Sequence, residues 1–108
     1  LGRDNPEAES AQQSVNSLFA APRHIRAFWW AEHISEGMLM MNRGQINVAE
    51  RAFGRAIRFL PDDHVAYYNL GLVFQRTGRE EAARKQYERI LNFAPGFELA
   101  QQRLAELR

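Results

Sequence analysis

Apolar residues recur at helical spacing along most of the chain. Tyr67, Leu70 and Phe74 lie three or four residues apart, which places their side chains on one face of an α-helix. Ala83 and Tyr87 continue the same spacing in the next segment. The pattern predicts helices over residues 23–42, 46–60, 63–77, 80–93 and 97–107. We therefore expect an all-α fold.

The pattern also repeats along the chain, with a period of about 34 residues that is typical of stacked helical units. Sliding the sequence against itself by one period aligns glycine with glycine, ring with ring and proline with proline. The matched pairs are Gly37 with Gly71, Gly44 with Gly78, Ala49 with Ala83, Phe53 with Tyr87, and Pro61 with Pro95. A partial third copy aligns Ala66 with Ala100 and Leu70 with Leu104.

Each unit has the features of two antiparallel helices. Gly71 and Ala83 are small, so the two backbones can approach each other closely where these residues face. Gly78 lies between the helical patterns and can adopt the positive φ that ends the first helix. Pro95 ends the second helix because proline cannot continue the hydrogen-bond ladder. We expect the large rings of one helix to meet the small residues of the other.

These residues resemble the tetratricopeptide (TPR) repeat, a helix–turn–helix of the same period. One copy comprises Tyr67, Leu70, Gly71, Phe74, Gly78, Ala83, Tyr87, Ile90 and Pro95, and the other His33, Gly37, Met40, Gly44, Ala49, Phe53, Ala56 and Pro61. The first copy departs from the family at His33, where an aromatic ring is usual, and at Glu36, where leucine is usual. The resemblance implies a short α–α superhelix over residues 23–108, with repeats at about 28–61 and 62–95 and a capping helix at 97–107.

A separate arm, residues 1–22, precedes the repeats. Asn5-Pro6-Glu7 is a favourable helix start, and apolar residues then recur on one face, which predicts an amphipathic helix over residues 6–20. Phe28, Trp29 and Trp30 would form an exposed apolar patch unless something covers them. We expect this helix to cover the patch or the groove, within its own chain or by exchange in a homodimer. The residues assigned to self-association are Val15, Leu18, Phe19, Phe28, Trp29 and Trp30.

The resemblance also implies a concave groove lined by the first helix of each pair, a surface that binds peptides or helices. The expected lining residues are Ile34, Met38, Met41, Val65, Tyr68, Asn69, Leu72, Arg76, Leu99 and Arg103. Asn69 could hydrogen-bond a ligand backbone, and Arg76 and Arg103 could bind a carboxylate. The alternative is that some of these residues, especially Ile34 and Leu72, are ordinary packing residues.

One specificity of the family can be tested against these positions. Many TPR domains bind the acidic tails of heat-shock chaperones through a clamp of basic and asparagine residues. Asn69 and Arg103 match two of its five places, whereas Ile34, Met38 and Leu99 occupy the others. The sequence therefore predicts a groove for a partly apolar partner instead of this clamp.

Catalytic and metal-binding patterns are missing from the sequence. There is no cysteine, and the three histidines lack the one-turn spacing of a metal pair. Asp62-Asp63 and Glu80-Glu81 lie at predicted helix starts, where negative charge suits the helix dipole. We expect no enzyme activity and no cofactor.

Charge and hydropathy exclude two further classes of partner. The net charge is +1, and the arginines at positions 51, 55 and 58 fit a solvated outer face better than a nucleic-acid site. No apolar run approaches the roughly 20 residues that cross a bilayer. We therefore predict no nucleic acid and no membrane insertion, and favour a soluble, cytoplasmic protein, although the compartment is not fixed by the sequence.

The pattern as a whole predicts a non-catalytic module that binds a protein or peptide. An alternative is the end of a longer TPR solenoid, acting as a scaffold or as a regulatory domain of a larger protein. The chain begins with Leu instead of Met, which fits that alternative.

Overall fold

The computed structural model describes residues 17–107, which contain no strand, and has five helices from Arg23 onward. The helices are α2 (Arg23–Asn42), α3 (Ile46–Phe59), α4 (His64–Arg76), α5 (Glu80–Phe93) and α6 (Glu98–Glu106). Each begins and ends within a residue of its predicted bounds. Most of the predicted 6–20 helix, including Val15, lies outside the described residues, and within them residues 17–19 are helical.

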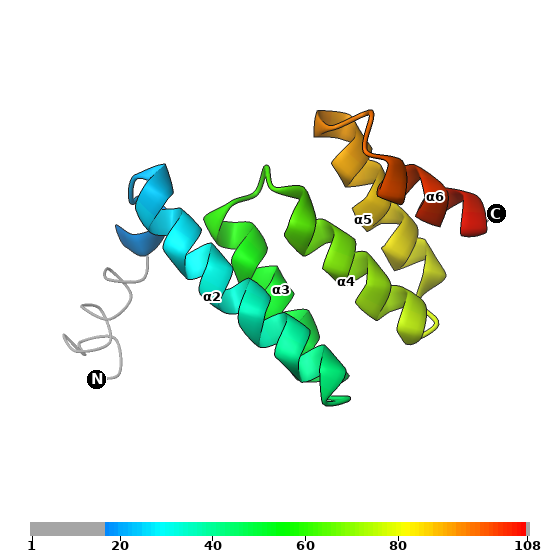
Figure 1. The fold of residues 1–108 in the computed structure, drawn as a ribbon, viewed down its shortest axis with the longest axis horizontal. Helices are drawn as coiled ribbons and strands as arrows, with labels where there is room; N and C mark the ends of the chain where they lie inside the picture. The colour runs from blue at the N-terminus through cyan, green and yellow to red at the C-terminus, as the bar shows by residue number, and fades with distance from the viewer. Residues whose placement is uncertain (1–16, 108) are drawn as a thin grey trace, which may run out of the picture.

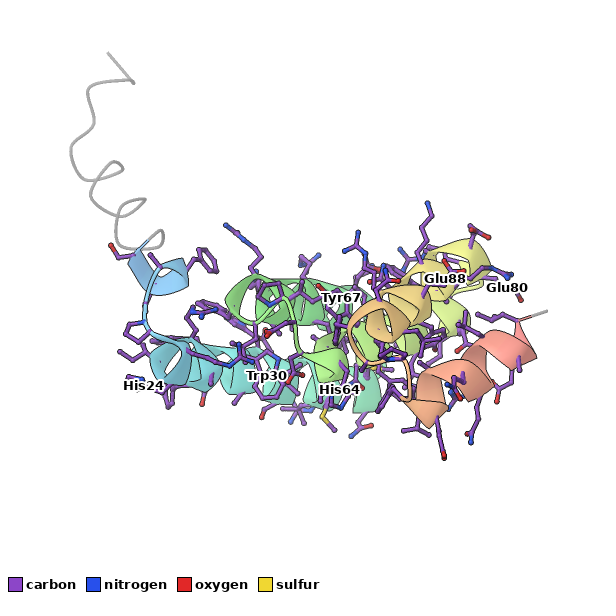
Figure 2. The ribbon with its side chains drawn as sticks, turned by 90° about the horizontal axis from the view of Figure 1, so that it is seen from above. His24, Trp30, His64, Tyr67, Glu80 and Glu88 are labelled. Carbon is purple, nitrogen blue, oxygen red and sulfur yellow. The ribbon has the colours of Figure 1, made fainter. Side chains whose placement is uncertain are left out.

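The helices form two antiparallel hairpins and a final single helix (Figure 1). Helix α2 packs on α3, α4 on α5, α3 on α4, and α6 on α5. Figure 2 shows α2, α4 and α6 along one side of the molecule, and α3 and α5 along the other. The predicted all-α fold of repeated helical hairpins is therefore confirmed.

Within each hairpin, a ring on the second helix fills a notch at a glycine on the first. A Cβ atom added to Gly71 would lie 2.5 Å from Cε1 of Tyr87, and one added to Gly37 would overlap the ring of Phe53. Both rings are fully buried. The two hairpins thus repeat one packing arrangement, with Phe53 and Tyr87 at equivalent positions.

The turns inside the hairpins are also equivalent. Gly44 has a φ of 76° and Gly78 a φ of 77°, the left-handed conformation that glycine adopts without steric cost. The amide of the residue after each glycine donates back across the helix end, from Gln45 to Met40 O and from Arg79 to Phe74 O, both at 2.8 Å. These bonds satisfy carbonyls that would otherwise lack partners, so each glycine ends its helix as expected.

The two aspartates between the hairpins have different roles. Asp63 caps α4, because its side chain accepts a hydrogen bond from the Val65 amide at 2.9 Å. Asp62 instead forms an ion pair with Arg23, at 3.1 Å from Nη1. This pair joins the start of α2 to the loop that links the hairpins.

The core consists of two apolar clusters that run through the stack. The first joins α2, α3 and α4, and the second joins α4, α5 and α6. Ile57 and Phe74 pack against both clusters. The core is therefore continuous, and α4 contributes to both halves of it.

Tyr87 makes the stability of the second hairpin depend on pH. Burial raises the pKa of its phenol from 10.0 to about 12, so the folded state favours the neutral form. Its contribution is complete below pH 10 and is lost as the pH rises towards 12. The free energy of unfolding should fall by roughly 2–3 kcal/mol over this interval. Urea unfolding of the wild type and Tyr87→Phe would test this, and equal alkaline slopes in both would contradict it.

Candidate functional site

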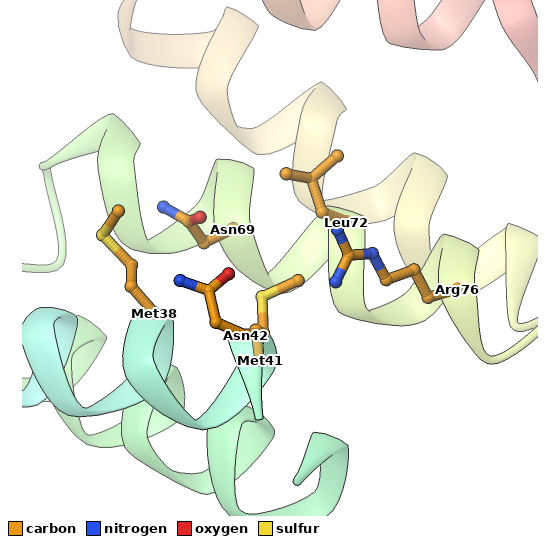
Figure 3. A pocket seen from close by; sticks show the side chains of 6 residues that line it. All are labelled: Met38, Met41, Asn42, Asn69, Leu72 and Arg76. Atoms are coloured by element: carbon orange, nitrogen blue, oxygen red, sulfur yellow. The ribbon is translucent and has the colours of Figure 1, made fainter. Parts of the chain in front are cut away.

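A hollow of about 130 Å³ lies between α2 and α4. Its lining residues are Met38, Met41, Asn42, Asn69, Leu72 and Arg76. Figure 3 shows the α2 side chains on one wall and the α4 side chains on the other. The first helices of the two hairpins thus form one shared concave surface, which we call the groove.

Flexible apolar side chains form much of this lining. Met38 is exposed, Leu72 is half-buried, and Met41 reaches into the first core cluster. Methionine is unbranched and polarisable, so it can adapt to ligands of irregular shape. The groove is therefore suited to apolar side chains without being specific for one of them.

Arg76 provides a free positive charge at the edge of the groove. Its guanidinium forms no hydrogen bond or ion pair with any residue between 17 and 107. Asn69, which lines the hollow, donates from Nδ2 to Val65 O at 2.8 Å, and its Oδ1 remains available as an acceptor. A ligand that offers an anionic or carbonyl oxygen to Arg76 and an amide to Asn69 would satisfy both.

The groove continues towards α6 as a second hollow of about 320 Å³, lined by Leu72, Gln75, Arg76 and Arg103. Gln75 accepts a hydrogen bond from the Tyr87 hydroxyl, which fixes its amide. Leu72 and Arg76 line both hollows. The two hollows are therefore parts of one surface that crosses α4.

Tyr68 holds Arg103 in place at the end of this surface. Nε of Arg103 donates to the Tyr68 hydroxyl at 3.1 Å, and Nη1 lies 3.2 Å from Glu106 Oε2. The hydrogen bond to Tyr68 raises the pKa of Arg103. Because Arg103 already has these partners and Arg76 has none among the described residues, Arg76 is the stronger candidate for binding an anion.

The structure brings together most of the residues expected in the groove. Five of them line the first hollow and Arg103 lines the second. Tyr68 acts through Arg103, and Val65 packs against the first core cluster. Ile34 is a buried core residue, so the packing alternative describes it better. Leu99 is exposed on α6 and lines neither hollow.

Sequence reasoning missed Asn42 and Gln75, although the repeat itself contained the signal. Asn42 stands one repeat before Arg76, and Gln75 stands one repeat after Met41. Each residue missed is thus the repeat partner of a residue expected in the groove. Applying the repeat to every candidate would have found both.

The residues assigned to self-association do not form one cluster. Phe19 packs on Phe59 of its own chain, with ring centroids 4.6 Å apart, and the Arg58 guanidinium lies 4.1 Å from the Phe19 centroid. Trp30 is half-buried against the first core cluster, so the body of the chain covers it and it does not contribute to an exposed patch. Phe28 and Trp29 remain exposed, at 59% and 36%. Phe19 thus packs on α3 and does not cover them.

The chain is similar to a protein from Cryptococcus neoformans var. grubii named tetratricopeptide repeat and J domain-containing co-chaperone DNJ1. The two are 30% identical over 77 residues, which make up 71% of this chain and 15% of that protein. The chain therefore spans a small part of its relative. No family model matches the chain.

Metal-binding clusters and membrane spans are both missing from the described part of the chain. Between residues 17 and 107, no three acidic or histidine side chains gather in a way that could hold a metal ion. None of the helices in that range is long and apolar enough to cross a membrane.

Proposed function

We propose that the chain is a non-catalytic interaction module of the TPR type, which binds a partly apolar peptide or helix in the groove. Three observations support this proposal. The sequence contains two aligned copies of one helical-hairpin pattern, the fold is a stack of helical hairpins, and the relative from Cryptococcus neoformans is named for its TPR repeats.

The observation that carries the proposal is the pairing of lining residues by the repeat. Met38 and Leu72 are equivalent positions on α2 and α4, as are Asn42 and Arg76, and both pairs line the same hollow. The same face of two successive hairpins therefore forms one continuous surface. An extended peptide or a helix can contact both hairpins at once, and such concave surfaces are how stacked repeats bind their partners.

The groove favours a ligand with apolar side chains and an acceptor oxygen. Met38, Met41 and Leu72 supply the apolar contact, and Arg76 supplies the cation. Within the described part of the chain, no acidic residue lines either hollow. We therefore expect ligands with one or two apolar side chains near a carboxylate, and weaker binding of ligands with basic residues at that position.

Two neighbouring residues on α2 provide a matched test. Met38 and Leu39 are exposed to similar extents, 49% and 47%, but Met38 lines the groove and Leu39 does not. Met38→Glu should weaken binding by at least about tenfold, because it places a charge among apolar contacts and next to the ligand's carboxylate. Leu39→Glu should leave the affinity within about twofold of the wild type.

The ligand for this test would be a peptide selected from a random displayed library against the immobilised chain. Its affinity for both variants would be measured by fluorescence anisotropy, with circular dichroism confirming their helical content. Equal loss of affinity in both variants, or no loss in either, would contradict binding in the groove.

Two further expectations stay predictions. One is homodimerisation by exchange of residues 6–20, and the other is a role within a longer solenoid or larger protein. Such an exchange requires residues 1–16, so deleting them would abolish a dimer of this kind.

A further inference from the structure

Helix α2 is longer than its repeat counterpart. It has 20 residues and α4 has 13, and the first residue of α4, His64, is equivalent to Trp30. The turns formed by residues 23–29 therefore have no equivalent in the second hairpin. They carry three exposed apolar side chains, Ile25, Phe28 and Trp29, and the last two rings meet edge to face at 5.3 Å.

The outer face of α2 also differs from the equivalent face of α4. On α4, Ala66 and Leu70 are buried against the preceding hairpin. Their repeat equivalents on α2 are Glu32 and Glu36. A preceding hairpin with an apolar face would bury both carboxylates, which is costly without a partner. A partner for this face must therefore combine an apolar surface with a hydrogen-bond donor or positive charge opposite Glu32.

The same face of a second copy would supply both the apolar surface and the hydrogen-bond donor. His24, Phe28 and Glu32 are spaced four residues apart, so they form one ridge along α2. The side chains of His24 and Glu32 are exposed and form no hydrogen bond or ion pair with any residue from 17 to 107. The imidazole N–H of His24 can donate to a carboxylate whether the ring is neutral or charged. The ridge thus carries a donor and an acceptor at equal distances from a central ring.

We propose that two copies of the chain pair through this ridge, with their α2 helices antiparallel and Phe28 of each copy at the two-fold axis. His24 of one copy then lies opposite Glu32 of the other, and the reverse contact follows by symmetry. Figure 2 shows His24 at the α2 end of the molecule, distant from Glu80 and Glu88 along its length. The groove lies further along α2, at residues 38–42, so this pairing does not depend on the proposed function.

Charge favours a second copy over the other possible occupants. A parallel pair would place Glu32 beside Glu32, which is unfavourable. The chain's own residues 1–16 carry one basic residue, Arg3, and three acidic residues, so they would bring net negative charge to Glu32. The antiparallel pair of copies instead matches each carboxylate with a donor.

Charge exchange at the two ends of the ridge tests the pairing. Sedimentation of the full chain should show a mass that rises with concentration from 12.5 kDa towards twice that value. His24→Glu should weaken association by about tenfold, because it places two carboxylates together at both ends of the interface. The double variant His24→Glu, Glu32→Lys restores opposite charges and should return the dissociation constant to within about threefold of the wild type. Glu88→Lys, a charge reversal at an exposed position on α5, should leave the dissociation constant unchanged.

Three outcomes would overturn the proposal. The first is a wild-type chain that remains at 12.5 kDa at every concentration. The second is a double variant that associates no better than His24→Glu. The third is loss of the dimer on deleting residues 1–16, which would assign it to exchange of the N-terminal segment. The substituted side chains on α2 and α5 are exposed, so we expect unchanged helicity in these variants, and an unchanged melting temperature at concentrations where the chain is monomeric.

Discussion

Replacing Phe53 with alanine should lower the free energy of unfolding by about 3–5 kcal/mol. The ring is fully buried and fills the notch at Gly37. It also belongs to the cluster that joins α2, α3 and α4, so its loss leaves a cavity where three helices meet. Such a loss is a large fraction of the stability of a small domain, which is typically about 5–15 kcal/mol. Urea unfolding followed by circular dichroism would measure it.

Phe28→Ala is the matched control for this change. It removes the same atoms, but from an exposed position on α2, so we expect less than about 0.5 kcal/mol of destabilisation. A comparable loss of stability at both positions would contradict the burial of Phe53 in the core. The proposed dimer adds a second expectation, because Phe28→Ala should weaken self-association while Phe53→Ala acts on folding.

Replacing Gly71 with alanine should destabilise the second hairpin by about 2 kcal/mol, although alanine is the better helix former. The new Cβ would lie 2.5 Å from Cε1 and 2.6 Å from Cζ of Tyr87. Tyr87 cannot easily retreat, because its ring is fully buried and its hydroxyl donates to Gln75. The helices must therefore separate or the ring must leave its preferred rotamer, and both cost free energy.

Gly54→Ala, in a helix of the first hairpin, should have the opposite effect on stability. Gly54 lies inside α3, and a Cβ added there would meet nothing within 4 Å. We expect this change to stabilise the fold by up to about 1 kcal/mol. A double-mutant cycle with Tyr87→Leu would identify the cause, since a smaller side chain at position 87 should reduce the cost of alanine at position 71. Equal effects of alanine at positions 54 and 71 would show that no close helix crossing exists.

The helices and their order could be predicted because local signals and the repeat agreed. Gly44 and Gly78 adopt the positive φ expected of them, and Phe53 and Tyr87 fill the expected glycine notches. Each of these features depends on residues close in sequence or on the repeat period. For this reason one hairpin predicted the geometry of the other.

The exposure of individual side chains could be predicted less well, because it depends on contacts between elements. Trp30 looked like part of an aromatic patch with its two neighbours, but it packs against the first core cluster. Leu99 was expected in the groove, but α6 presents it to solvent outside both hollows. Spacing along one helix does not reveal which of its sides a neighbouring helix will cover. The exposure of both Trp30 and Leu99 depends on such neighbours.

The inner faces of α2 and α4 together form the proposed binding surface. Amide chemical shifts of the ¹⁵N-labelled chain, followed during titration with a selected peptide, test this assignment most directly. We expect the largest changes at Met38, Asn69, Leu72 and Arg76, on both helices at once. Changes confined to the opposite side of the molecule, at Arg55 and Arg89 on α3 and α5, would contradict it.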